Sequence, residues 1–194
     1  MALWIPRLEW NDQTVNANVT NGNATLTGIA STTAINAGMV ASGTGIPSNA
    51  LVISKTANSV TLDVVATSSG SYAVTFFERY DFEFPPVKDT EEKLKPKQTI
   101  SDALDGSQQF TTLYLEATRD LEFYFVNQTD ADKLKDNFYR YAYKGYFFRY
   151  YPDKDEAPVF NMQLDKSDFV RTRQVKKHPY FKYSLGFTFR RVVE

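Results

Sequence analysis

The chain consists of two stretches whose composition differs sharply. Residues 13–77 contain two charged residues, Lys55 and Asp63, and residues 11–75 contain a single aromatic residue, Tyr72, although 15% of the whole chain is aromatic. The remaining sequence is dense in Phe, Tyr, Lys, Arg, Asp and Glu. A break of this kind marks the boundary of a module, and 194 residues are enough for two small domains with real cores.

The low-charge block has the pattern of short strands. Apolar residues alternate with Thr and Ser, as in residues 24–29, 59–64 and 72–76, which suits strands with one buried face. Gly, Asn and Ser gather between these runs, where turns need them. We therefore predict a small all-β domain at residues 17–77, a β-sandwich or β-roll, inserted into a body made of residues 1–16 and 78–194.

Three strings in the block resemble an all-β module of bacteriophage virion proteins. They are GNATLTG at residues 22–28, AGMVASGTGIP at 37–47 and SVTL at 59–62, and the likeness covers about a third of the chain. The resemblance implies an Ig-like or similar β decoration on an exposed surface. Another small extracellular-type β domain would share the same Thr, Ser and Gly texture.

The body is expected to be mainly β, a sandwich or barrel-like fold with one flanking helix. Strand patterns recur at residues 110–116, 121–125, 146–151, 159–164, 169–173 and 181–193, and a turn is expected at residues 117–120. Helical spacing of Ala131, Leu134, Phe138 and either Tyr141 or Ala142 predicts a helix from about 130 to 144 that packs one face on the sheet.

Two segments are predicted to make contacts between copies. Residues 85–97 are charged and flanked by proline, so we expect an extended arm or loop, and residues 146–151 form an aromatic strand. The candidate interface residues are Pro85, Pro86, Lys88, Glu91, Glu92, Lys93, Lys95, Tyr146, Phe148 and Tyr150.

Charge is distributed unevenly along the body. Residues 81–136 carry thirteen acidic and seven basic residues, net −6, whereas residues 166–194 carry eight basic and two acidic residues, net +6. Opposite fields favour head-to-tail contacts between copies, unless the two segments neutralise each other within one sheet. Arg171, Arg173, Lys176 and Lys177 are candidates for facing a DNA passage, and a solvated strand face is the alternative.

Nothing in the sequence predicts catalysis, a metal site or a cofactor. There is no cysteine, and the single histidine, His178, lies in a predicted turn. The acidic pairs Glu91/Glu92, Asp130/Asp132 and Asp153/Asp155 are explained by solubility, capping or turn formation. The net charge of −1 argues against general nucleic-acid or membrane-surface binding, and we expect no signal peptide and no membrane-spanning segment.

The order of elements in the body resembles that of phage tail-hub proteins, the distal tail and tail-tube family. The likeness is carried by residues 110–125, the helix segment DKLKDNF at 132–138, the strand GYFFRY at 145–150 and YSLGFTF at 183–189, followed by Arg190-Arg191-Val192. It implies a virion protein, made in the host cytoplasm, that forms a hexameric ring between the tail tube and the tip or fibres. Its partners would be itself, other virion tail proteins and DNA passing without sequence-specific binding.

Two alternatives to the tail ring remain open. One is a carbohydrate- or receptor-binding module of a virion, since exposed Tyr rings can stack on sugars. The other is a head-to-tail connector or terminator protein. Ring assembly predicts aromatic residues buried between subunits, whereas the binding module predicts a monomer with exposed aromatic residues.

Overall fold

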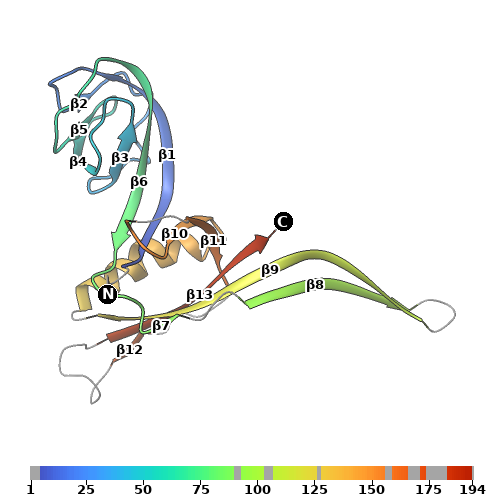
Figure 1. The fold of residues 1–194 in the computed structure, drawn as a ribbon. Coiled ribbons are helices and arrows are strands. Elements are labelled where there is room, and N and C mark those ends of the chain that lie inside the picture. Colours follow the sequence, from blue (N-terminus) through green and yellow to red (C-terminus); the bar gives the residue numbers. More distant parts are fainter. Residues whose placement is uncertain are drawn as a thin grey trace. The chain divides into compact units, whose positions relative to one another are not determined.

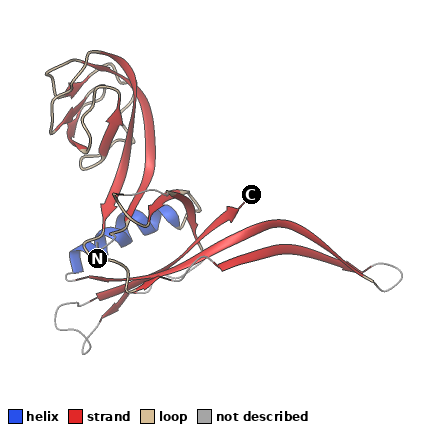
Figure 2. Ribbon diagram, in the orientation of Figure 1, coloured by secondary structure: helices blue, strands red, loops and turns tan. Residues whose placement is uncertain are grey.

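The computed structural model describes residues 5–89, 93–102, 107–125, 128–155, 159–165, 171–173 and 183–193. Its strands form one large antiparallel sheet with a single helix (Figures 1 and 2), which confirms the mainly β prediction. The strands are β1 (Arg7–Val19), β2 (Thr25–Leu26), β3 (Val40–Gly43), β4 (Ala50–Lys55), β5 (Val60–Leu62), β6 (Gly70–Asp81), β7 (Lys88–Asp89), β8 (Lys93–Asp102), β9 (Gln108–Phe125), β10 (Phe148–Tyr151), β11 (Phe160–Leu164), β12 (Arg171–Arg173) and β13 (Tyr183–Val193).

Backbone contacts divide the chain into two compact units. The first comprises Met1–Leu8 and Asp81–Glu194, and the second comprises Glu9–Tyr80. The second unit contains the low-charge block, although its bounds lie a few residues outside 17–77 at either end. Whether the block is a separately folding, Ig-like insertion stays a prediction.

The strands of the second unit close into a small barrel. Their order is β2-β5-β4-β3-β6-β1, and the ring is completed where Asn18 of β1 pairs with Thr27, directly after β2. The two closing hydrogen bonds run from Asn18 N to Thr27 O, 2.8 Å, and from Thr27 N to Asn18 O, 3.1 Å. This bridge joins the two ends of the strand order and so shortens the open edge available for unwanted strand pairing.

The barrel is filled by the apolar members of the alternating runs. Leu26, Ile29, Val60, Val74 and Phe76 are fully buried there, while the intervening Thr, Ser and Asn residues face outward. The period of two in the sequence is thus realised as an inside and an outside of each strand.

In the first unit, β9 and β13 form the centre of the sheet. They pair along eleven residues, from Tyr183 opposite Phe125 to Val193 opposite Leu115. On one side of this pair lie β7 and β8, both bonded to β9, and on the other lie β11 and β12, both bonded to β13. β10 joins the sheet through β11.

One 15-residue helix packs on this sheet. It comprises α1 (Gln128–Lys133), a π-helical turn η1 (Leu134–Tyr139) and α2 (Arg140–Ala142). The predicted face is the buried one, and Ala142 rather than Tyr141 is its last member. The Phe138 ring makes edge contacts with Phe148, Phe187 and Phe189 of the sheet, at centroid distances of 4.8, 5.8 and 6.2 Å.

One prediction about the body is wrong. The turn expected at residues 117–120 does not form, and β9 runs without interruption for 18 residues. Residues 117–120 hold no Gly, Pro or Asn, and Ala117 and Leu121 are buried core residues. The segment 85–97, expected to be an extended arm or loop, contains β7 and the first half of β8.

Candidate functional site

The most distinctive element of the first unit is the two-stranded ribbon made by β8 and the first half of β9. Their register runs from Lys93 opposite Thr118 to Asp102 opposite Gln108. Among the described strands, β8 is bonded to β9 alone. Figure 1 shows the ribbon running out past the strands that flank the rest of β9.

The ribbon has an apolar face that this chain leaves exposed. Leu94 and Ile100 are spaced by an even number of residues on β8, so they lie on the same face, and they are 58% and 57% exposed. Leu94 lies opposite Ala117, which is buried on the face of β9 that carries Leu121 and Phe123. The apolar face of the ribbon therefore continues the sheet face that the helix covers.

The opposite face of the ribbon is polar. Lys93 reaches Asp120 at 3.6 Å, and Thr99 and Ser101 are exposed. The register shifts by one residue between Lys97 and Gln98, where Leu113 of β9 is skipped. Because of this bulge, even-numbered residues of β8 lie opposite odd-numbered residues of β9 before it and opposite even-numbered residues after it. Leu94 thus lies opposite Ala117, and Ile100 lies opposite Phe110.

A second exposed apolar group lies in the turn between the helix and β10. Tyr143, Tyr146 and Phe147 are all more than half exposed there. Gly145 ends the helix with φ of 83°, a conformation that suits glycine after a helical C-terminus. Gln163 of β11 donates to the Gly145 carbonyl at 2.8 Å and thereby fixes the turn to the sheet. We call Tyr143, Tyr146 and Phe147 the aromatic turn.

The predicted interface residues have different environments. Lys88 and Lys93 are exposed, Pro85 and Pro86 are half-buried, and Tyr146 belongs to the aromatic turn. Phe148 and Tyr150 are buried inside the unit, so their side chains fill its core rather than a surface. Lys95 lies in β8, and Glu91 and Glu92 lie outside the described residues.

A partly buried ion pair fixes β7 against β9. Arg119 donates to Asp89 through Nε at 2.6 Å and through a second bond from Nη2, and the two side chains are 15% and 14% exposed. The guanidinium also lies over the ring of Tyr150, 5.4 Å from its centroid. Burial raises the pKa of the Tyr150 hydroxyl well above its usual value of 10.0, although the charge of Arg119 opposes that shift.

Opposite charges also meet across the central strands. Arg190 of β13 lies 3.7 Å from Glu116 of β9, and Thr188 donates to Asp120 at 2.8 Å. The contact of Arg190 with Glu116 favours neutralisation of the acidic and basic segments within one sheet. The candidates for a DNA passage are less defined: Arg171 and Arg173 lie in β12 opposite Leu185 and Tyr183, while Lys176 and Lys177 fall outside the described residues.

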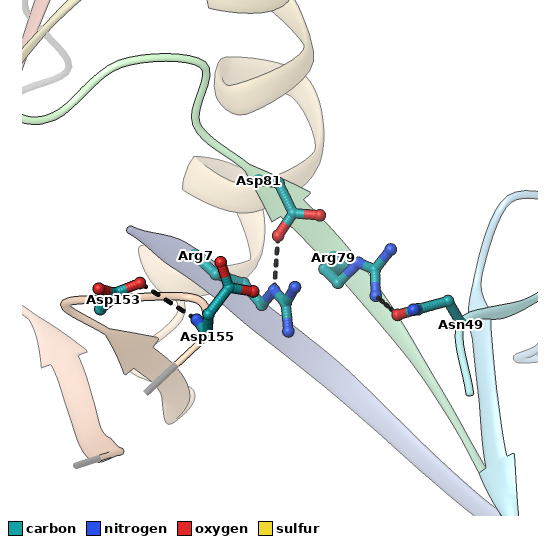
Figure 3. A network of polar contacts seen from close by, with 6 residues as sticks. All are labelled: Arg7, Asn49, Arg79, Asp81, Asp153 and Asp155. Atoms are coloured by element: carbon teal, nitrogen blue, oxygen red, sulfur yellow. Dashed lines mark hydrogen bonds and ion pairs between the residues drawn. The ribbon is translucent and has the colours of Figure 1, made fainter. Parts of the chain in front are cut away.

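The acidic groups of the described residues serve local structure. Asp153 accepts a hydrogen bond from the backbone N of Asp155 at 3.1 Å, as in an Asx turn. Asp81 accepts from Arg7, and Asn49 accepts from Arg79 (Figure 3). No group of three or more acidic, His or Cys side chains among the described residues is arranged to hold a metal ion, and no described helix has the length and apolar character needed to cross a membrane.

Comparison of the chain with protein-family models, curated proteins and solved structures gave no match. The likeness to phage tail proteins therefore depends on the sequence strings and the order of elements described above. The arm predicted at residues 85–97 overlaps the ribbon at residues 93–97, and sequence reasoning missed the ribbon with its apolar face. The signal was available in residues 93–102, where Leu94 and Ile100 alternate with Lys, Thr and Ser.

Proposed function

We propose that this protein is a non-enzymatic structural subunit of a phage tail that assembles with copies of itself into a ring, of six subunits in the tail-hub family that it resembles. In this proposal the ring joins the tail tube to the tip or fibres and leaves a passage for DNA. The chain would work in the virion together with other tail proteins, and the barrel unit would form a decoration on the ring.

The exposed apolar face of the ribbon is the observation that carries the proposal. A two-stranded hairpin is marginally stable alone in water, and it gains stability when a third layer covers its apolar face. Leu94 and Ile100 have no such cover within the described chain. A neighbouring subunit would supply it, and a contact between two different surfaces of identical chains forms a ring where the rotation between neighbours closes.

The substitution Leu94→Asp tests this contact. It places a charge on the apolar face of the ribbon, and because Leu94 is 58% exposed we expect it to abolish rings while the chain stays folded. The matched control is Lys93→Gln, at the next residue on the polar face, which should leave rings intact. Light scattering and negative-stain imaging report the result, and rings that persist with Leu94→Asp would contradict the role of this face.

The aromatic turn supports the carbohydrate-binding alternative. Its three exposed rings are held by Gly145 and Gln163, and Tyr rings with polar tips are suited to stack on sugars. This alternative predicts a monomer that binds a glycan array and loses that binding on Tyr143→Ala. Rings that do not bind glycans would exclude the carbohydrate-binding alternative. Rings in which a neighbouring subunit covers Tyr146 would exclude it as well.

A further inference from the structure

The outer edge of β8 is open. Its inner edge is hydrogen-bonded to β9, and no described strand pairs with the other side. Such an edge presents a row of backbone N–H and C=O groups that can receive another strand, and proteins usually protect long open edges. The protection of β8 covers half of its length.

The first half of β8 carries the protecting residues. Lys93, Lys95 and Lys97 place charge along it, and Pro96 lacks an N–H group, which confines it to the edge of a sheet. The second half, from Gln98 to Asp102, contains no proline, and its one charged residue, Asp102, is the last residue of the strand. Its residues Thr99 and Ile100 are good strand formers. The edge is therefore blocked near the base of the ribbon and permissive toward its tip.

The permissive half is complementary to itself. In an antiparallel pair centred on Ile100, the two Ile100 residues face each other, Thr99 faces Ser101, and Gln98 faces Asp102. An apolar pair and a hydroxyl pair are favourable across strands. The paired segment ends at Asp102, so the lysines of each copy lie beyond the strand of the other.

We propose that two copies of this chain join through the second half of β8, as an antiparallel pair with its two-fold axis at Ile100. The contact turns two ribbons into one four-stranded sheet, β9-β8-β8-β9, which is the size at which a sheet becomes stable in its own right. It is a two-fold contact and differs from the ring contact, since it uses the strand edge rather than the apolar face. In a tail it would link two rings, or hold a pair of subunits before ring assembly.

Single cysteines in the full-length chain test the register, because the natural chain has none. In the proposed pair the Cβ atoms of the two Ile100 residues are about 5 Å apart, near enough for a disulfide after a small adjustment. The matched control is Leu94→Cys, since Leu94 and Ile100 lie on one strand and face and are 58% and 57% exposed. In this register the two Leu94 residues are offset by twelve positions, roughly 40 Å.

Under mild oxidation, Ile100→Cys should run as a dimer on a non-reducing gel, and Leu94→Cys should remain a monomer. The Ile100→Cys cross-link should disappear when Thr99→Lys and Ser101→Lys are added, because lysines then face lysines across the pair. Circular dichroism and a thermal melt show whether each variant is folded. Absence of the Ile100→Cys dimer, or equal cross-linking at both positions, would overturn the proposed register.

The ring proposal is decided separately. Rings that form without the Ile100→Cys cross-link would contradict the two-fold contact and leave the ring standing. A cross-linked dimer without rings would contradict the ring and leave the two-fold contact standing. Leu94→Asp should break rings while leaving the cross-link of Ile100→Cys in place, because position 94 lies outside the paired segment.

Discussion

The ion pair between Arg119 and Asp89 joins β7 to β9 and should contribute to the stability of the first unit. Asp89→Ala removes both hydrogen bonds from a guanidinium that is 15% exposed, so we expect it to lower the free energy of unfolding by about 2 kcal/mol, between the values for exposed and fully buried pairs. The control is Lys133→Ala, which breaks an exposed helix pair with Asp130 and should cost less than about 1 kcal/mol. Urea denaturation measures both, and equal costs would contradict the burial of the Arg119 pair.

A second residue prediction concerns pH. Burial raises the pKa of Glu78 above its ordinary 4.5, while a hydrogen bond with Asn11 opposes the shift. The folded state therefore binds this proton more tightly than the unfolded state. The free energy of unfolding falls as pH rises from the ordinary pKa of Glu78 through its folded pKa. Glu78→Gln removes the ionisation, so we expect the variant to melt higher than the natural protein at pH 7.

The advantage of Glu78→Gln should shrink as the pH is lowered and vanish below the ordinary pKa of 4.5, where the carboxyl group is protonated in both states. Melting temperatures of the two proteins across about pH 4 to 8 provide the comparison. A difference that stays constant over that range would show that ionisation of Glu78 is not its cause.

At the level of elements, packing beside the closing pair of the barrel can be tested with two glycines. Gly28 follows the closing residue Thr27 and has φ of 69°, and a Cβ there would lie 2.6 Å from Nδ2 of Asn18. Gly38 has φ of 89° with nothing within 4 Å of the same position. Alanine pays about 1 to 2 kcal/mol for a left-handed conformation at either site.

Gly28→Ala should therefore cost more stability than Gly38→Ala, since the added methyl group also forces the side-chain amide of Asn18 to move. Thermal melts of the two variants give the difference directly, because the backbone strain is common to both. Equal melting temperatures would contradict a tight contact between position 28 and the Asn18 side chain.

Periodicity predicted the elements that bury one regular face. The helix was recognised because Ala131, Leu134 and Phe138 recur at helical spacing, and each is buried against the sheet. The failure at residues 117–120 has a physical origin. Asp120 favours a turn in the sequence, but in the sheet it accepts a hydrogen bond from Thr188, and its neighbour Arg119 pairs with Asp89. Local sequence patterns do not contain these long-range contacts.

For the whole molecule, composition separated the two units but not their topology. The near absence of charge in residues 13–77 marks the barrel unit, whereas its closure depends on one distant pair, Asn18 with Thr27. For the candidate site, the sequence predicted an arm that overlaps the ribbon, but neither its paired strands nor its apolar face. The aromatic strand was predicted to be a subunit interface, yet Phe148 and Tyr150 are core residues, because a strand of a sheet with one covered face buries every second side chain.

Assembly of the full-length chain into rings is the central claim. The most direct test is the mass of the purified protein by light scattering, together with negative-stain images of the same sample. We predict a particle of six times the 22.1 kDa chain mass, or twelve times if two rings are joined, with a central opening. A folded monomer at all accessible concentrations would contradict self-assembly and favour the binding-module alternative.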